Sequence, residues 1–308
     1  MNVSSKLLFI YLYINNLMKK ELKKLLQNAI LSFNKESSQT QIFYPEFDGK
    51  KYFIKVAGED RAKYLLNEVE SLKKLKKLSP FYKNYYIGYE KKDRKVAIML
   101  KYVSGIDLYT LIKSRKLNNQ IITNLYKILL KKIKIFHDKL LNHGDIKPQN
   151  LYAYIKEDGD IDIEYIDTES VNDFNKDIKS GEGYNNVISS KYDFPYKIKR
   201  SRIMFKNKEN AFSFYKFLDL YSISIFIFYL YKKDVYKKIK NDSESPWIVK
   251  NIQHLPTEYL NKEESDTNKL EKALCYVFSF LKYVSTVNKT NEVKDIPISI
   301  NEILKILS

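Results

Sequence analysis

The period of the hydrophobic pattern changes once along this chain, near residues 101–105, and this change constrains the fold most. Before it, short runs rich in aromatic and β-branched residues surround one helical stripe, whereas after it apolar residues recur mainly at helical spacing. An Asp48-Gly49 pair between two such runs predicts a β-hairpin. The expected elements are strands at 41–47, 51–56, 85–89 and 96–102 and a helix at 63–78. The sequence therefore predicts an α+β protein, with a small sheet-containing part followed by a larger helical part.

The larger part begins with one long amphipathic helix. Its expected apolar stripe consists of Ile121, Ile122, Leu125, Ile128, Leu129, Ile133 and Phe136. Residues 218–230 predict a second, buried helix, and 270–284 predict a third. We expect a helical extension over residues 1–28, a small lobe over 29–102 and a large lobe over 103–308.

The N-terminal stretch contains an unbroken apolar run at residues 7–14. It is too short to span a bilayer, which needs about 20 apolar residues, and no small-residue cleavage site follows it. From Met18 onward, leucines and alanine recur at helical spacing between lysines, namely Leu22, Leu25, Leu26 and Ala29. We expect a helix packed on the small lobe in a cytoplasmic protein. Contact with a membrane surface and a secretion signal stay open as alternatives.

The composition restricts the classes of partner and cofactor. The formal net charge is +17, but the lysines are spread along the chain and accompany no known nucleic-acid-binding signature. A specific nucleic-acid partner is therefore not expected. A single cysteine, Cys275, excludes a disulfide framework and a cysteine-based zinc site within this chain.

Most of the polar residues typical of a catalytic site lie in one short segment. Residues 143–150 read His-Gly-Asp-Ile-Lys-Pro-Gln-Asn, which matches the spacing H-x-D-x-x-x-x-N. Phe136-His137 precedes this segment, and Asp167 follows an alternating run at 161–165. In these motifs, the chain resembles the eukaryotic-type protein kinase superfamily. The resemblance implies a bilobal protein-kinase-like fold, ATP as phosphate donor and Mg²⁺ as cofactor.

The resemblance also implies a role for each polar residue of this segment. Asp145 would orient the acceptor hydroxyl and take its proton, and Lys147 would neutralise charge on the γ-phosphate. Asn150 and Asp167 would hold Mg²⁺ through hard oxygen ligands. A lysine two residues after the catalytic aspartate is typical of Ser/Thr protein kinases, so the resemblance favours a protein Ser/Thr hydroxyl as acceptor.

Upstream of this segment, the resemblance implies a phosphate-binding ion pair. Lys55 follows the predicted hairpin and would bind the α- and β-phosphates of ATP. Its partner on the helix would be Glu68. Glu70 competes for this role, because the gap between Lys55 and Glu68 is shorter than the family usually has.

A hinge between the two lobes is implied by residues 97–108. Leu100 would be the gatekeeper, and the backbone of Lys101 to Val103 would bind adenine. Asp107 would contact the ribose, although an aspartate there is also a good N-cap for the following helix.

Several residues depart from the family's pattern. No glycine-rich loop precedes Lys55, and residues 34–38 are expected to take its place. Phe53 replaces the small residue usual over adenine, and Asp167 is followed by Thr-Glu rather than Phe-Gly. Gly144 replaces the usual arginine, which predicts activity that does not depend on phosphorylation of the segment after Asp167.

The sequence leaves alternatives open both for the phosphate acceptor and for catalytic activity itself. Asp219, in the predicted buried helix, resembles the aspartate that braces the catalytic loop in protein kinases, and together with Lys147 it favours a protein substrate. By contrast, His-Gly-Asp at 143–145 followed by Ile-Asp-Thr-Glu at 166–169, with Gly144 and Glu169, resembles aminoglycoside and choline kinases. Heptose kinases share a degenerate small lobe. These enzymes act on small molecules or glycans. The missing glycine-rich loop and Phe53 leave open a pseudokinase that binds a partner without transferring phosphate.

Overall fold

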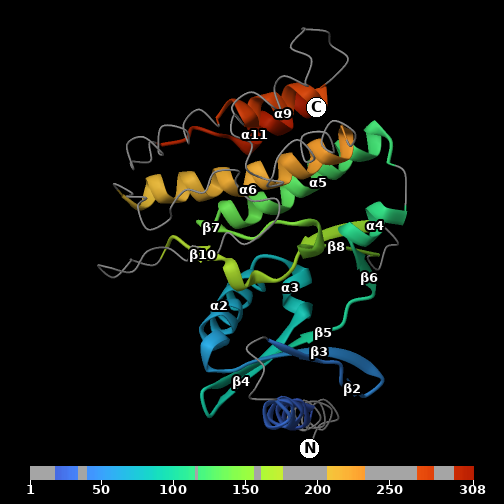
Figure 1. The fold of residues 1–308 in the computed structure, drawn as a ribbon, viewed down its shortest axis with the longest axis vertical. Coiled ribbons are helices and arrows are strands. Elements are labelled where there is room, and N and C mark those ends of the chain that lie inside the picture. Colours follow the sequence, from blue (N-terminus) through green and yellow to red (C-terminus); the bar gives the residue numbers. More distant parts are fainter. Residues whose placement is uncertain are drawn as a thin grey trace, which may run out of the picture. The chain divides into compact units, whose positions relative to one another are not determined.

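The computed structural model describes residues 18–33, 40–114, 117–155, 161–175, 207–232, 269–280 and 295–308. The chain divides into two compact units, Met1–Val103 and Ser104–Ser308. It is a mixed α+β protein with a small antiparallel sheet in its N-terminal part and mainly helices after it (Figure 1).

The sheet of the first unit is antiparallel, with strand order β1-β3-β5-β4 and β2 paired to β3. Its strands are β1 (Gln41–Phe43), β2 (Glu46–Phe47), β3 (Lys50–Ala57), β4 (Tyr86–Lys92) and β5 (Lys95–Lys101). The predicted hairpin is confirmed: β2 and β3 are joined by Asp48-Gly49, with φ of 52° and 64°. A second two-residue turn, Asp93-Arg94, joins β4 and β5 with φ of 49° and 62°. Positive φ at both central residues is typical of the tightest hairpins.

Two helices of the first unit differ from the predictions, one in its boundaries and one in being unexpected. Helix α2 (Glu59–Leu75) begins before the expected start at residue 63, because two acidic residues stabilise its first turn, and it ends before residue 78. A further helix, α3 (Pro80–Tyr85), was not expected. Ser79 caps it by accepting a hydrogen bond from the Phe81 N–H, and Pro80 suits its first position. The assignment of Tyr85 to a strand was therefore wrong.

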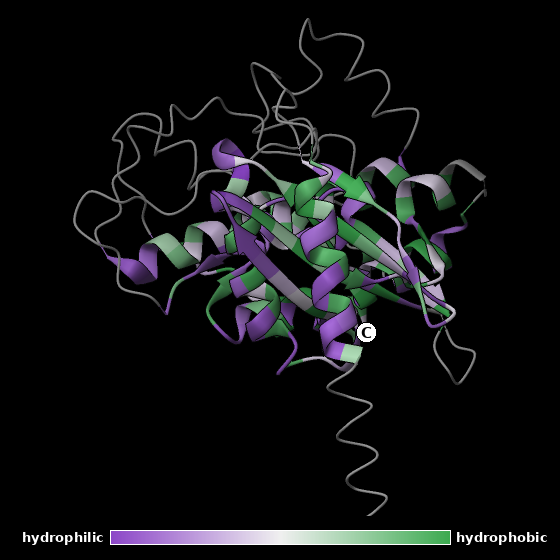
Figure 2. Ribbon diagram, turned by 90° about the horizontal axis from the view of Figure 1, so that it is seen from below, coloured by the Kyte–Doolittle hydropathy of each residue, from purple (hydrophilic) through white to green (hydrophobic). Residues whose placement is uncertain are grey.

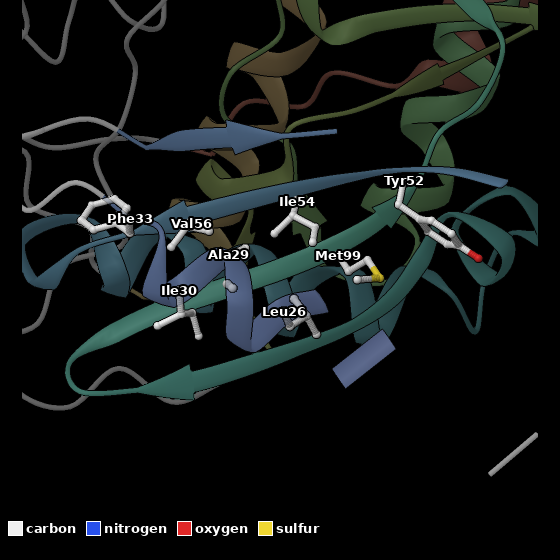
Figure 3. Packing of buried hydrophobic residues seen from close by; sticks show 9 residues of the cluster. Leu26, Ala29, Ile30, Phe33, Tyr52, Ile54, Val56 and Met99 are labelled. Atoms are coloured by element: carbon white, nitrogen blue, oxygen red, sulfur yellow. The ribbon is translucent and has the colours of Figure 1, made fainter. Parts of the chain in front are cut away.

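A helix at residues 18–31 covers one face of the sheet. The close-up in Figure 3 shows its apolar side chains directed at β3 and β5. The buried cluster consists of Leu26, Ala29, Ile30, Phe33, Tyr52, Ile54, Val56, Ala97 and Met99. The predicted packing of this helix on the small lobe is confirmed. The helix runs across position 28/29, where we expected the extension to end, and the apolar run at 7–14 lies outside the described residues.

The second unit contains two small antiparallel sheets beside its helices. One sheet consists of β6 (Gly105–Asp107), β8 (Leu151–Ile155) and β9 (Ile161–Tyr165), and the other of β7 (Leu141–Asn142) and β10 (Asn172–Asp173). The helices are α4 (Leu108–Ser114), α5 (Asn119–His137), α6 (Lys208–Tyr231), α9 (Lys269–Ser279) and α11 (Ile300–Leu307), with 3₁₀ turns η1 (Pro148–Asn150) and η2 (Thr168–Ser170).

The core of the second unit lies between α5, α6, α9 and α11, which pack against one another. The predicted stripe of α5 is largely buried, but Ile121 is 47% exposed, because neighbouring residues of a helix point about 100° apart and Ile122 occupies the core position. Coloured by hydropathy, the described helices carry both hydrophilic and hydrophobic stretches (Figure 2). By contrast, α6 is apolar along most of its length. Among the described residues it is the one helix long and apolar enough to cross a membrane, but 89% of that stretch is buried inside the protein, as expected for a core helix.

Candidate functional site

In the first unit, Lys55 and Glu68 form the predicted ion pair. The Lys55 Nζ lies 2.9 Å from both carboxylate oxygens of Glu68. The Glu68 side chain is only 1% exposed, and a carboxylate buried to this degree requires a charged partner. Glu70, the competing residue, is exposed and pairs with Lys73 at 2.8 Å. The structure therefore selects Glu68.

The periodicities of β3 and α2 bring the two side chains together. Side chains alternate along a strand, so Lys55 points to the face opposite Ile54 and Val56, which contact the helix at 18–31. On α2, Glu68 lies one turn from Leu65 and Leu72, both fully buried. The charged pair thus lies within an apolar face, where water screens it little.

The predicted hinge residues lie at the end of β5. Leu100 is fully buried, and Lys101 is the last residue of the strand. The Tyr102 N–H donates to the Lys51 carbonyl at 3.0 Å, so this donor already serves the sheet. Adenine binding by the backbones of Lys101 and Val103 stays a prediction.

Phe53, which stands where the resembled family has a small residue, packs against another aromatic side chain. Its ring packs edge-on against Tyr44, with 5.6 Å between the ring centroids. Phe53 shares its face of β3 with Lys55, because the two residues are separated by one position. Residues 34–38, expected to replace the glycine-rich loop, lie outside the described residues.

In the second unit, the three predicted catalytic residues converge on one carboxylate oxygen. The Lys147 Nζ donates to Asp145 Oδ2 at 2.6 Å, and the Asn150 Nδ2 donates to the same oxygen at 3.0 Å. Asn150 also donates to the Asp145 backbone carbonyl at 2.9 Å. Asp145 is 3% exposed. Two donors on one oxygen fix the orientation of this carboxylate, as a general base requires.

The segment that carries these residues is a compact turn between β7 and β8. Pro148 opens the 3₁₀ turn η1, and the Asn150 N–H donates to the Lys147 carbonyl at 2.8 Å. Because proline fixes φ and lacks an N–H, it suits the first position of such a turn. The turn brings Lys147 and Asn150 back toward Asp145.

His143 connects this turn to the residue before Asp167. The Ile166 carbonyl can only accept, so His143 Nε2 carries the hydrogen in their 3.1 Å contact. The Asp145 N–H can only donate, so His143 Nδ1 is the bare nitrogen in their 3.3 Å contact. These bonds require a neutral imidazole, and burial lowers the pKa of His143 in agreement. Ile166 in turn donates its N–H to the Asn150 carbonyl at 2.9 Å.

Asp167 directly follows this connection and has a left-handed backbone, with φ of 61° and ψ of 65°. Such a conformation is uncommon for residues other than glycine and is often found at functional sites. Its carboxylate and the Asn150 side-chain oxygen are hard oxygen ligands of the kind that Mg²⁺ prefers. Asn150 uses its amide nitrogen toward Asp145, so its Oδ1 is the atom suited to a cation. The donor set therefore fits Mg²⁺.

Asp219 on α6 holds the start of the segment at residues 143–150, as predicted. Its Oδ2 accepts the His143 N–H at 2.8 Å and its Oδ1 accepts the Gly144 N–H at 3.0 Å. His137 Nε2 lies 3.1 Å from Oδ2 and donates a third hydrogen bond. Asp219 is 2% exposed. In the sequence, His137 stands out only as part of a Phe-His pair. Its hydrogen bond to Asp219 could not be predicted from this spacing.

The backbone at position 144, where the resembled family has arginine, requires glycine. Its φ is +78°, and a Cβ at this position would lie 2.5 Å from the Ser170 carbonyl oxygen. A side chain would therefore clash with the backbone that follows Asp167. Nearby, the Asn172 Nδ2 donates to Asn142 Oδ1 at 2.9 Å across the β7–β10 pair. Backbone packing and this buried amide pair hold the start of the segment after Asp167. Most of that segment, 176–206, lies outside the described residues.

Asp107 acts as the N-cap of α4. Its Oδ1 accepts the Thr110 N–H at 2.9 Å, and its Oδ2 accepts the Thr110 hydroxyl at 2.8 Å. This is the capping arrangement that the sequence offered as the alternative to ribose contact. Contact with a ribose stays a prediction.

A buried charged cluster next to the site was missed by the sequence analysis. Lys132 on α5 lies 2.7 Å from Asp162 and 2.5 Å from Glu164, both on β9. Only the apolar residues of β9 were expected to face inward, but Glu164 is 2% exposed because α5 covers it. Since β9 leads directly to Asp167, this cluster fixes the strand that precedes the proposed metal ligand.

Burial raises the pKa of Glu164 from 4.5 to about 7 although Lys132 is close. The folded protein therefore binds this proton more tightly than the unfolded chain. The resulting stabilisation is complete below pH 4.5 and is lost as the pH rises through 7. A shift of this size corresponds to roughly 3 kcal/mol. We expect the free energy of unfolding of Glu164→Gln, measured in urea, to depend less on pH between 5 and 8 than that of the wild type. An unchanged pH dependence would contradict this assignment, and the exposed-site variant Glu70→Gln is the control.

Comparisons with known proteins give a limited result. No family model matches the chain. The chain is similar to a probable serine/threonine-protein kinase of Dictyostelium discoideum, with 29% identity over 89 residues. This stretch is 29% of the present chain and 13% of that protein, so the chain matches only a small part of the relative. The similarity indicates a distant kinase-like relation.

Proposed function

We propose that this chain is a kinase-like phosphotransferase that transfers the γ-phosphate of ATP to a Ser or Thr hydroxyl of a protein. One observation carries the proposal: the buried Asp145 carboxylate accepts hydrogen bonds from both Lys147 and Asn150. These are the residue types that phosphoryl transfer to a hydroxyl needs at this spacing. The partial similarity to a probable Ser/Thr kinase supports the same class.

In this proposal, Asp145 orients the acceptor hydroxyl and takes its proton. Lys147, now 2.6 Å from Asp145, supplies a positive charge for the transferring phosphoryl group. Asn150 and Asp167 would hold Mg²⁺, which when bound neutralises charge on the phosphates. Through its two ring nitrogens, His143 holds the Asp145 N–H and the carbonyl of Ile166, the residue before Asp167.

The first unit would contribute nucleotide binding. Lys55, oriented by Glu68, would contact the α- and β-phosphates. The backbones of Lys101 and Val103 would bind adenine. Asp107 would contact the ribose while also capping α4.

The experiment that tests the proposal uses the full chain with labelled ATP, Mg²⁺ and two acceptor mixtures, one of proteins and one of sugars and aminoglycosides. Label on phosphoserine or phosphothreonine would support the proposal. Label on phosphotyrosine alone, or only on a glycan or small molecule, would overturn the acceptor assignment. ATP binding without any transfer would overturn the catalytic assignment in favour of a pseudokinase.

Replacing Lys147 by alanine should lower kcat by about 10²-fold, the scale of one lost electrostatic stabiliser. The KM for ATP should change little, because Lys147 contacts Asp145 in the second unit rather than the Lys55–Glu68 pair. Steady-state kinetics of Lys147→Ala would be compared with Lys134→Ala, whose lysine pairs with Asp138 on the exposed end of α5. A rise in KM with unchanged kcat would show that Lys147 binds the nucleotide instead.

A further inference from the structure

We infer that Phe33, which follows the helix at 18–31, is a positioning residue for the Lys55–Glu68 pair. The inference rests on the proposed function, since it concerns the ion pair that would bind phosphates. The two members of this pair lie on different elements, β3 and α2. Phe33 packs in the cluster on β3 and also lies against the N-cap of α2.

The first contact of Phe33 is with the cluster that packs on β3. Phe33 belongs to the cluster in which the helix at 18–31 packs on Ile54 and Val56 of β3 (Figure 3). Lys55 lies between these two residues and points to the other face of the strand. A shift of Ile54 and Val56 would therefore move Lys55 as well.

The second contact is made at the start of α2. Gly58 is the N-cap of this helix, and a Cβ built on it would lie 3.1 and 3.2 Å from two ring carbons of Phe33. The ring thus packs directly on the backbone from which α2 begins. Gly58 has φ of −77° and ψ of −174°, which alanine can adopt, so space rather than backbone conformation favours glycine here.

A third contact fixes Phe33 itself. The Lys95 Nζ donates to the Ile30 carbonyl at 3.2 Å and lies 5.4 Å from the centroid of the Phe33 ring. The Ile30 carbonyl lies in the last turn of the helix at 18–31, where the backbone lacks helical donors and a cation is favourable. Because Lys95 begins β5, the ring is held by β5 while it contacts β3 and α2.

Only Gly58 separates β3 from α2, so the chain itself fixes how far apart the two elements are. The contacts of the ring predict instead that it fixes the orientation of α2 relative to β3. Removing it should let α2 move relative to β3 and weaken the Lys55–Glu68 pair. Phe33→Ala should then increase amide hydrogen exchange in peptides covering β3 and the first half of α2 by roughly tenfold or more, while α6 in the second unit keeps its protection. Leu31→Ala is the matched control, because Leu31 belongs to the same helix but is 67% exposed.

Gly58→Ala tests the same contact without removing core volume. Its added methyl group should push against the ring and also increase exchange at the start of α2. In the Phe33→Ala background the same substitution should have no such effect, because the ring that it would meet is absent. This variant keeps the inference testable if Phe33→Ala fails to fold.

A positioning role is separated from general stabilisation by a double-mutant cycle on ATP binding, measured by calorimetry. Phe33→Ala should weaken binding of Mg²⁺-ATP in the wild type and have little further effect in a Lys55→Met background. Phe33→Leu should restore most of the affinity. Additive losses in the cycle, or unchanged exchange in α2 of folded Phe33→Ala, would overturn the inference. Amide hydrogen exchange does not require turnover. It would therefore still test the role of Phe33 if the protein showed no phosphotransferase activity, and the two failures could be told apart.

Discussion

Asp145→Asn should reduce phosphate transfer by about 10²- to 10⁴-fold, the usual contribution of a general base. Asparagine has nearly the same shape as aspartate, but its amide cannot take a proton from the acceptor hydroxyl. It also carries no negative charge to pair with Lys147, which lies 2.6 Å from the carboxylate in the wild type. The loss should appear in kcat, measured with labelled ATP and the best acceptor found.

Binding of ATP should survive this substitution, because Asp145 contacts residues of its own turn. Asp138→Asn provides the matched control, since Asp138 is an exposed carboxylate at the end of α5. Full activity of Asp145→Asn would show that another group takes the proton. Loss of ATP binding together with activity would show that the substitution disturbs the fold.

The proximity of the three candidate catalytic residues could be predicted from the sequence because their contacts are local. Asp145, Lys147 and Asn150 lie within one short turn, so their spacing largely fixes how they meet. The hairpin at Asp48-Gly49 was predictable for the same reason, since two residues determine its backbone.

The choice of Glu68 as the partner of Lys55 is confirmed, but the sequence left Glu70 as a competitor. Both lie on the same helix near the expected position, and only the packing of α2 on the sheet decides which carboxylate is buried. The second hairpin gave no signal because Asp93-Arg94 contains no glycine. A sequence pattern reports backbone preference, whereas these outcomes depend on what a tertiary neighbour covers.

Contacts between distant segments explain the remaining differences. The burial of Glu164 depends on α5 lying over β9, and the need for glycine at position 144 depends on the Ser170 carbonyl. The departure at Gly144, interpreted from sequence as the loss of an arginine, is in the structure a close approach of two backbones. Together with the Asn142–Asn172 bond, it holds the residues just after Asp167 without a phosphate. This arrangement agrees with the expectation of phosphorylation-independent activity, which stays a prediction.

Asp219→Ala should cause a large loss of stability. The carboxylate accepts hydrogen bonds from the N–H groups of His143 and Gly144 and from the His137 ring. Alanine would leave these buried donors without an acceptor, and breaking such a buried network costs about 3–5 kcal/mol. The free energy of unfolding, measured by chemical denaturation, should fall by this amount.

The same substitution should lower activity beyond its effect on the folded fraction, because His143 and Gly144 precede Asp145 directly and hold it in place. Asp219→Asn should be intermediate, since its amide keeps one oxygen acceptor but places a donor where a second acceptor is needed. Glu209→Ala is the matched control on the same helix: its side chain is exposed in the first turn of α6, and removing it should cost less than about 1 kcal/mol. If Asp219→Ala were no less stable than this control, the hydrogen bonds to Asp219 would not be what holds the catalytic turn. The position of Asp145 would then have to depend on η1 and His143 alone.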